Sequence, residues 1–137
     1  MANALYTKAK QGLISGLIDL DTAVIKCVLV RGYTPSLSTH TFVSEVTGTL
    51  VGTPQTLTSV SVADGVFDAA DVTFTSVPAG AACPYILIYQ ASAVGGGSDV
   101  ASSSQRVIAL IDDAPVTPNG GDISIVWSNG ASKIFSL

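Results

Sequence analysis

The chain has 137 residues, enough for one domain with a substantial core, yet only 12% of them are charged while 47% are hydrophobic. Its net charge is −4 and its six basic residues lie singly along the chain, which argues against direct nucleic-acid binding because no basic stripe could neutralise phosphates. No apolar run approaches the roughly 18 residues of a spanning helix, so we expect no membrane insertion.

The low charge predicts that other protein subunits cover much of the surface. The charged share is about half of that found in an average soluble domain. Because a membrane is not expected to cover this surface, we expect a homo-oligomer or a subunit of a larger assembly. The N-terminal stretch lacks the basic region and long apolar core of a secretory signal peptide, so we do not interpret it as one. The two cysteines leave the compartment undecided, with a cytoplasmic origin favoured.

Residues 3–16 predict a short N-terminal helix. Asn3 can cap its first turn, and Leu5 and Leu13 fall on one narrow apolar stripe. Gly16 suits the left-handed conformation that ends such a helix. Because the stripe is narrow, we expect the helix to lean on a sheet edge or on a neighbouring subunit.

Short strands dominate the rest of the pattern. Residues 22–31 are apolar on both faces, so both faces of this strand should be covered. Residues 32–55 predict a long connecting loop, within which residues 39–46 could form two helical turns. Further short strands separated by turn residues are expected at 56–62, 72–77, 85–90, 106–112, 123–127 and 133–137.

This spacing of about seven short strands is typical of a mainly β protein, an antiparallel β-sandwich or open barrel, with residues 1–137 forming one domain. The most continuously apolar segments, 85–89 and 107–111, are the candidates for central strands. At the C-terminal end, Asn129-Gly130 between two β-rich runs predicts a hairpin within residues 117–137.

The two cysteines and the glycine-rich loop each leave two interpretations open. Cys27 and Cys83 lie in apolar runs, which favours buried thiols over a disulfide, although the sequence leaves both open. The glycine- and serine-rich loop 91–104 is either a contact loop or a solvated hairpin tip. It is not a phosphate cradle, because it lacks the Lys-Ser/Thr partner and a following helix.

The chemistry-bearing residues do not form a catalytic pattern. His40 is the only histidine, and its place in a polar stretch favours a capping or surface role over catalysis. One histidine and two separated cysteines do not supply a zinc site. Five aspartates are candidates for a calcium-binding loop: Asp64, Asp68, Asp71, Asp112 and Asp113. The EF-hand pattern is missing, however, so roles in turns and loops are favoured for them. We expect no enzyme and no cofactor.

The aromatic residues divide into two groups. Tyr85, Tyr89 and Trp127 lie in predicted strands and are expected in the core, where Trp127 would be an anchor. Tyr33 lies in the long loop and is better placed to meet a partner. A stacking platform for a glycan, built from Tyr33 and the loop 91–104, is the alternative role.

Several stretches resemble one family, the small structural proteins of tailed bacteriophages. They are MANALY at 1–6 opening into a helix, residues 19–30, GVFDAADVTF at 65–74, and VTPNGGDI at 116–123 together with KIF at 133–135. The resemblance spans most of the chain and rests on structural motifs. It implies a virion component, assembled in the host cytoplasm, and it carries over no catalytic residues.

The composition and the resemblance together predict a non-enzymatic virion protein, foremost a cement or decoration subunit that stabilises the capsid. A tail, collar or spike subunit is the first alternative, and a receptor- or glycan-binding β-sandwich is the second. The expected partners are the major capsid protein or neck and tail proteins, and further copies of this chain. The candidate interface residues are Leu5, Leu13, Tyr33, Leu37 and Phe42.

Overall fold

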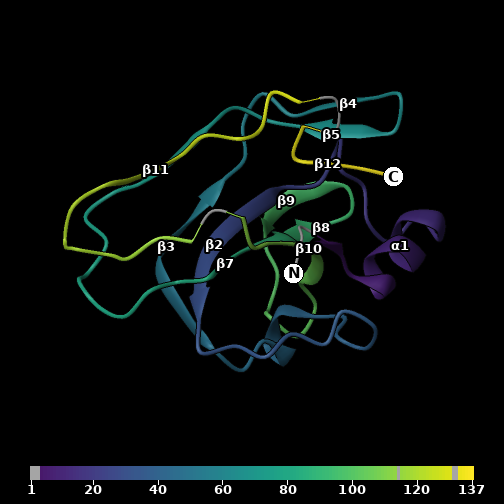
Figure 1. Cartoon of the computed structure of the whole chain (residues 1–137). Helices are drawn as coiled ribbons and strands as arrows, with labels where there is room; N and C mark the ends of the chain where they lie inside the picture. Colours follow the sequence, from purple (N-terminus) through teal and green to yellow (C-terminus); the bar gives the residue numbers. More distant parts are fainter. Residues whose placement is uncertain (1–3, 114, 131–132) are drawn as a thin grey trace.

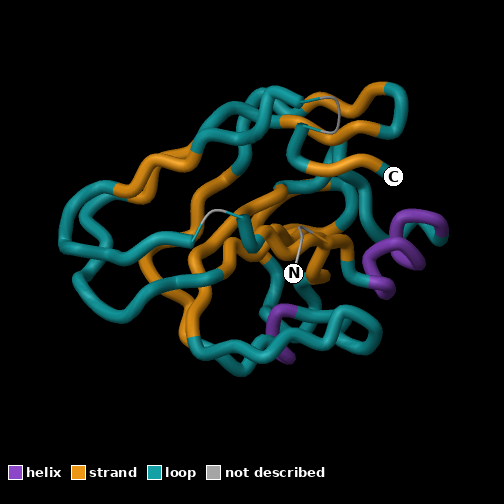
Figure 2. Tube along the Cα trace, in the orientation of Figure 1, coloured by secondary structure: helices purple, strands orange, loops and turns teal. Residues whose placement is uncertain are grey.

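The computed structural model describes residues 4–113, 115–130 and 133–137, and it is mainly β with antiparallel strand pairs (Figure 1). Figure 2 shows that the strands are joined by long loops and that the α helix projects at one side of the molecule. Within the described residues, no helix combines the length and apolar character that crossing a membrane requires. The mainly β fold class predicted from the sequence is confirmed.

The described elements follow one another in many short pieces. In chain order they are β1 (Ala4–Leu5), α1 (Thr7–Ile14), β2 (Ile25–Arg31), the 3-10 turn η1 (Val43–Glu45), β3 (Thr49–Thr56), β4 (Ser61–Ala63), β5 (Val66–Asp68), β6 (Val72–Phe74), β7 (Tyr85–Gln90), β8 (Ser92–Ala93), β9 (Gly96–Asp99), β10 (Arg106–Ile111), β11 (Ile123–Ile125) and β12 (Phe135–Ser136).

The largest sheet, here called the main sheet, has the strand order β1-β10-β7-β2-β3. Its middle strand is β7, with β10 and β2 on its two sides, so the central placement predicted for the two most apolar segments is confirmed. Both faces of β2 are buried over Cys27–Val30, as its two-sided apolar pattern requires. Cys27 and Cys83 are both buried and both free, as favoured.

Smaller sheets complete the fold. The three-stranded sheet has the order β12-β5-β4, and β11 pairs with β6. In Figure 1 the three-stranded sheet lies at the end of the molecule that holds the C-terminus. Phe67 of β5 and Phe135 of β12 stack at 4.9 Å between ring centroids, and both belong to the same buried cluster as the main sheet.

The hairpin predicted within residues 117–137 is wrong. Strand β11 pairs with β6, and β12 pairs with β5, so the two runs do not pair with each other. A two-residue hairpin of the I′ type needs positive φ at both central residues, and neither Asn129 nor Gly130 has one. The pattern of that turn is found instead at Asp64-Gly65, with φ of 52° and 75°, where it joins β4 to β5.

The loop predicted at 32–55 is shorter than expected, because β3 occupies residues 49–56 as an edge strand of the main sheet. No strand covers the expected range 56–62: the chain leaves β3 at Thr56 and enters β4 only at Ser61. Gly52 and Pro54 made this segment look like a loop in the sequence, because both residue types are rare in strand interiors. An edge strand nevertheless tolerates proline, and a β-bulge tolerates glycine. Gly52 has φ +77°, next to a register shift against β2. The expected helical turns reduce to η1.

The N-terminal helix is shorter than the predicted 3–16 and begins at Thr7 after Tyr6. The predicted cap, Asn3, lies outside the described residues. Residues 4–5 instead join the main sheet as β1, and the backbone N–H of Tyr6 donates to the carbonyl of Ile108. Gly16 has φ +74°, which ends the helix as predicted.

Trp127 is a core residue, as predicted, with only 6% of its surface exposed. Its indole N–H donates to the carbonyl of Ala70 at 3.1 Å, and its backbone N–H donates to Oδ1 of Asp71 at 2.9 Å. Trp127 therefore ties the chain after β11 to the segment before β6.

We predict that Trp127→Ala lowers the free energy of unfolding by about 3–5 kcal/mol, because a large buried side chain leaves a cavity. The matched control is Val126→Ala, whose side chain is 71% exposed and should change stability little. Chemical denaturation of both variants measures the difference. Equal stability of the two variants would contradict the core assignment.

Candidate contact surface around helix α1

Helix α1 packs on β10 through its small residues. Ala9 and Gly12 are its buried residues. A Cβ at Gly12 would lie 2.9 Å from Cδ1 of Ile18, so glycine lets the chain after the helix return closely beneath it. Its last residue, Ile14, is 88% exposed, and Leu17, in the loop after the helix, is 48% exposed. A projecting helix whose end and following loop expose two large aliphatic side chains is suited to contact with another protein.

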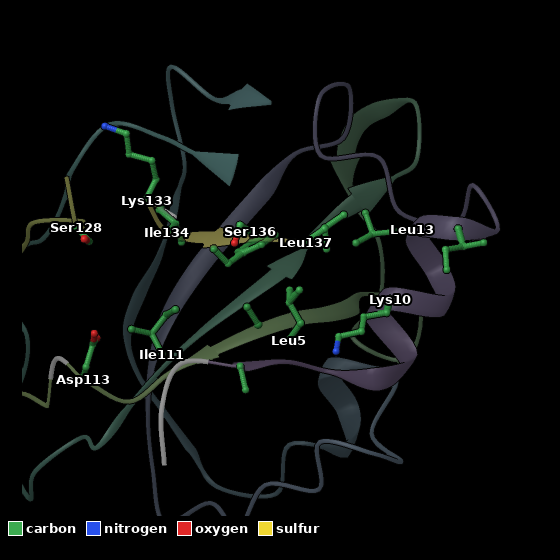
Figure 3. Close-up of a pocket in the computed structure, with 14 residues that line it drawn as sticks. Leu5, Lys10, Leu13, Ile111, Asp113, Ser128, Lys133, Ile134, Ser136 and Leu137 are labelled. Carbon is green, nitrogen blue, oxygen red and sulfur yellow. The ribbon is translucent and has the colours of Figure 1, made fainter. Parts of the chain in front are cut away.

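A groove of about 810 Å³ runs along one side of α1 (Figure 3). Leu5 of β1 and Ala109 and Ile111 of β10 contribute from the main sheet. Figure 3 shows Lys10 and Leu13 of α1 at one end of the groove and Lys133, Ser128 and Asp113 at the other. Residues 134–137, which include β12, form the remaining wall. We call this feature the α1–β12 groove.

A smaller hollow lies on another side of α1. It has a volume of about 290 Å³ and is lined by Lys8, Gln11, Gly12, Leu17, Thr41, Phe42 and Arg106. The guanidinium of Arg106 lies 5.1 Å from the ring centroid of Phe42, within the range of a cation–π contact. Helix α1 therefore stands as a ridge between two depressions.

Four of the five interface residues predicted from the sequence gather around this ridge. Leu5 and Leu13 line the groove, and Phe42 lines the hollow. The carbonyl of Leu37 accepts a hydrogen bond of 2.7 Å from the backbone N–H of Thr7, the first residue of α1. The structure thus brings together residues from β1, α1 and the loop after β2. We call the surface formed by Leu5, Leu13, Leu37, Phe42, Ile14 and Leu17 the α1 surface.

Tyr33, the fifth predicted residue, lies inside the protein with 6% exposure. Its hydroxyl is 2.9 Å from the hydroxyl of the fully buried Tyr6 and 2.6 Å from Nδ1 of His40. Its ring stacks with the His40 ring and meets Tyr85 edge-on. A ring enclosed in this way offers little surface to a partner, so Tyr33 is better described as a residue that positions the loop.

His40 is only partly buried, and its Nδ1 lies 2.6 Å from the Tyr33 hydroxyl. The chain of three polar groups, Tyr6, Tyr33 and His40, links the residue before α1 to the loop that follows β2. Burial raises the pKa of Tyr6 far above its ordinary value, and burial also raises the pKa of Tyr33. Both phenols therefore stay neutral and remain able to donate hydrogen bonds at physiological pH.

The aspartates considered for calcium have separate structural surroundings. Asp64 forms the β4–β5 turn, and Asp71 accepts the hydrogen bond from the Trp127 backbone. In the part of the chain that the structure describes, no three His, Cys, Asp or Glu side chains gather as a metal site would require. The loop 91–104 contains the hairpin β8–β9, which an ion pair of 2.7 Å between Lys26 and Asp99 ties to the main sheet.

Comparison of the chain with protein-family models, with curated proteins and with solved structures finds no match. The geometry of the α1 surface and the sequence pattern therefore carry the functional argument.

The sequence did not reveal Ile14, Leu17 or the β12 wall as parts of the contact surface. Ile14 is a large apolar residue that falls outside the stripe of Leu5 and Leu13, and this departure could have marked it. The β12 wall could not be found, because it depends on the pairing of β12 with β5 across the sequence.

We predict that Tyr33→Phe costs about 1–3 kcal/mol of stability, because it leaves the buried hydroxyl of Tyr6 without its partner. Tyr89→Phe is the control: Tyr89 is 4% exposed, and its hydroxyl makes no hydrogen bond within the described residues. Thermal and chemical unfolding measure both. A Tyr33→Phe variant as stable as Tyr89→Phe would show that the polar chain contributes nothing.

Alkaline pH should destabilise the protein. Burial raises the pKa of Cys27 from 9.0 to about 12 and that of Tyr89 from 10.0 to about 12, so the unfolded chain loses these protons first. Stability is then fully present below about pH 9 and declines as the pH rises toward 12. Unfolding curves across this range, with tyrosinate absorbance as a second readout, measure it. Constant stability up to pH 12 would contradict this burial.

Proposed function

We propose that this chain is a non-enzymatic structural protein of a tailed-bacteriophage virion, and that it serves as a cement or decoration subunit of the capsid. The resemblance supports the virion class, and the low share of charged residues supports a subunit whose surface is covered in an assembly. Its mechanism is additive: each copy buries apolar surface against the major capsid protein and so stabilises the joints between capsid subunits.

The observation that carries the proposal is the exposed apolar end of α1. Ile14 and Leu17 stand at the crest of a ridge, with a depression on each side that can receive side chains of a partner. Burying one such aliphatic side chain contributes roughly 1.5–3 kcal/mol. A few such contacts, repeated over many copies, suffice to strengthen a shell.

The charges around α1 indicate the partner's chemistry. Three of the six basic residues, Lys8, Lys10 and Arg106, lie on this surface of a chain whose net charge is −4. Charge complementarity between interfaces therefore favours an acidic patch on the capsid protein. The association should weaken as the salt concentration rises.

A subunit of a tail or collar ring is the second candidate, because β4 is an exposed edge strand of the three-stranded sheet and could pair with a strand of another copy. The copy number per virion distinguishes the two roles: a decoration subunit is present at a copy number like that of the capsid protein, and a collar ring at far fewer. The glycan-binding alternative loses its stacking platform, since Tyr33 is buried.

We predict that Leu17→Asp lowers the affinity for heads assembled without this subunit by about tenfold or more, since loss of one buried aliphatic contact costs more than about 1.4 kcal/mol. Leu50→Asp is the matched control, with a similar exposure of 42% against 48% but a position on β3. Co-sedimentation with heads measures binding. Equal binding of both variants would remove the α1 surface from the contact.

A further inference from the structure

The hollow of about 290 Å³ beside α1 is positively charged. Two of its lining residues, Lys8 and Arg106, are basic, and none is acidic. Neither cation has an ion pair within the described residues. A guanidinium and an ammonium that line one hollow without a carboxylate partner favour a negatively charged occupant. We call this feature the Arg106 hollow.

The side chain of Arg106 is held from two sides. Its guanidinium lies 5.1 Å from the ring centroid of Phe42, and a Cβ at Gly12 would lie 3.9 Å from Cδ of Arg106. The backbone of Arg106 is fixed as well, by a bridge to Phe42 and by pairing with Gln90 of β7. The Phe42 ring offers no oxygen acceptor, and no other described residue accepts a hydrogen bond from this guanidinium. Its N–H groups are therefore positioned and available to a partner.

We propose that the Arg106 hollow binds one aspartate or glutamate side chain of the major capsid protein, with both carboxylate oxygens accepting hydrogen bonds from the guanidinium of Arg106. A planar guanidinium presents its donors as a fork that matches the two oxygens of a carboxylate. The inference deepens the proposed function and rests on it for the identity of the partner.

The other lining residues favour an acidic side chain of a protein over a free anion. Leu17 and Phe42 add apolar surface to the hollow, and Leu17 is 48% exposed. The methylene groups of an acidic side chain can pack on Leu17 while its carboxylate reaches Arg106. The amide of Gln11 can donate a further hydrogen bond. A free inorganic anion would use the donors and leave Leu17 exposed to water.

The other cations of the chain are less suited to this role. Lys26 already has a carboxylate partner at 2.7 Å. Nη1 of Arg31 donates to the carbonyl of Ala81 at 3.3 Å. The two lysines of the α1–β12 groove share that groove with the carboxylate of Asp113, which repels an incoming carboxylate. Arg106 is thus the arginine that remains for a partner.

The first test uses the unaltered full chain, whose two arginines, Arg31 and Arg106, can be followed separately by NMR at their Nε–H groups. The probe is N-acetyl-glutamate α-amide, which carries one side-chain carboxylate. The Arg106 signal should shift saturably, with a dissociation constant in roughly the millimolar range, while the Arg31 signal stays in place. N-acetyl-glutamine α-amide, which lacks the carboxylate, should shift neither. Failure of the Arg106 signal to shift overturns the proposal.

The second test measures co-sedimentation with heads assembled without this subunit. Arg106→Gln should lower the affinity by about tenfold or more, because the partner's carboxylate is then left in the contact without its cation. Arg106→Lys keeps the charge but loses the fork, so it should also bind more weakly. Lys26→Gln is the control, since it removes an equal charge outside both depressions. Circular dichroism confirms that each variant is folded.

The outcomes separate this inference from the proposed function. If Arg106→Gln binds heads as well as Lys26→Gln does, while Leu17→Asp binds poorly, the Arg106 contact is wrong and the capsid role stands. If the unaltered chain does not bind heads, the capsid role fails, and with it the partner named here. In that case a saturable shift of the Arg106 signal still supports a carboxylate site in the hollow.

Discussion

The structure depends on the register of β7 between β2 and β10. Ile88 is paired with Cys27 on one side and with Ala109 on the other, at the centre of the buried cluster. Because these strands are apolar on both faces, their pattern alone would not prevent a slip of one residue. The register is held instead by the bulge in β10 between Val107 and Ala109 and by polar contacts at the strand ends.

Those end contacts also place the surface that we propose to be functional. Gln90 at the end of β7 is 3% exposed, and its amide bonds the backbone of Leu17 and Asp19, directly after α1. At the other end of the helix, Tyr6 bonds the backbone of β10 and the hydroxyl of Tyr33. The helix is therefore fixed at both ends by the core, while Ile14 remains exposed between them. Rigid support of this kind lowers the entropy lost on binding.

The sequence predicts features set by local chemistry and misses those set by pairing across the chain. The apolar runs of β7 and β10, the helix stop at Gly16, the Asp64-Gly65 turn and the buried Trp127 all follow from short patterns. The predicted Asn129-Gly130 hairpin does not form, because β11 pairs with β6 and β12 pairs with β5, both distant in the sequence. Leu5 and Leu13 could be chosen from their stripe, whereas the wall opposite them exists only once β12 has paired. The sequence predicts Tyr33 at a contact surface, but the structure buries it, because a loop tyrosine can be enclosed by residues distant in the sequence, here Tyr6 and Tyr85.

The central claim is that α1 and the depressions beside it form the contact with a capsid. A cryo-electron microscopy map of a tailed-phage virion that carries this chain tests it most directly. We expect density for the subunit on the head, with α1 and Ile14 turned toward the major capsid protein. Density on the tail or neck, or a head-bound subunit whose α1 faces solvent, would contradict the claim.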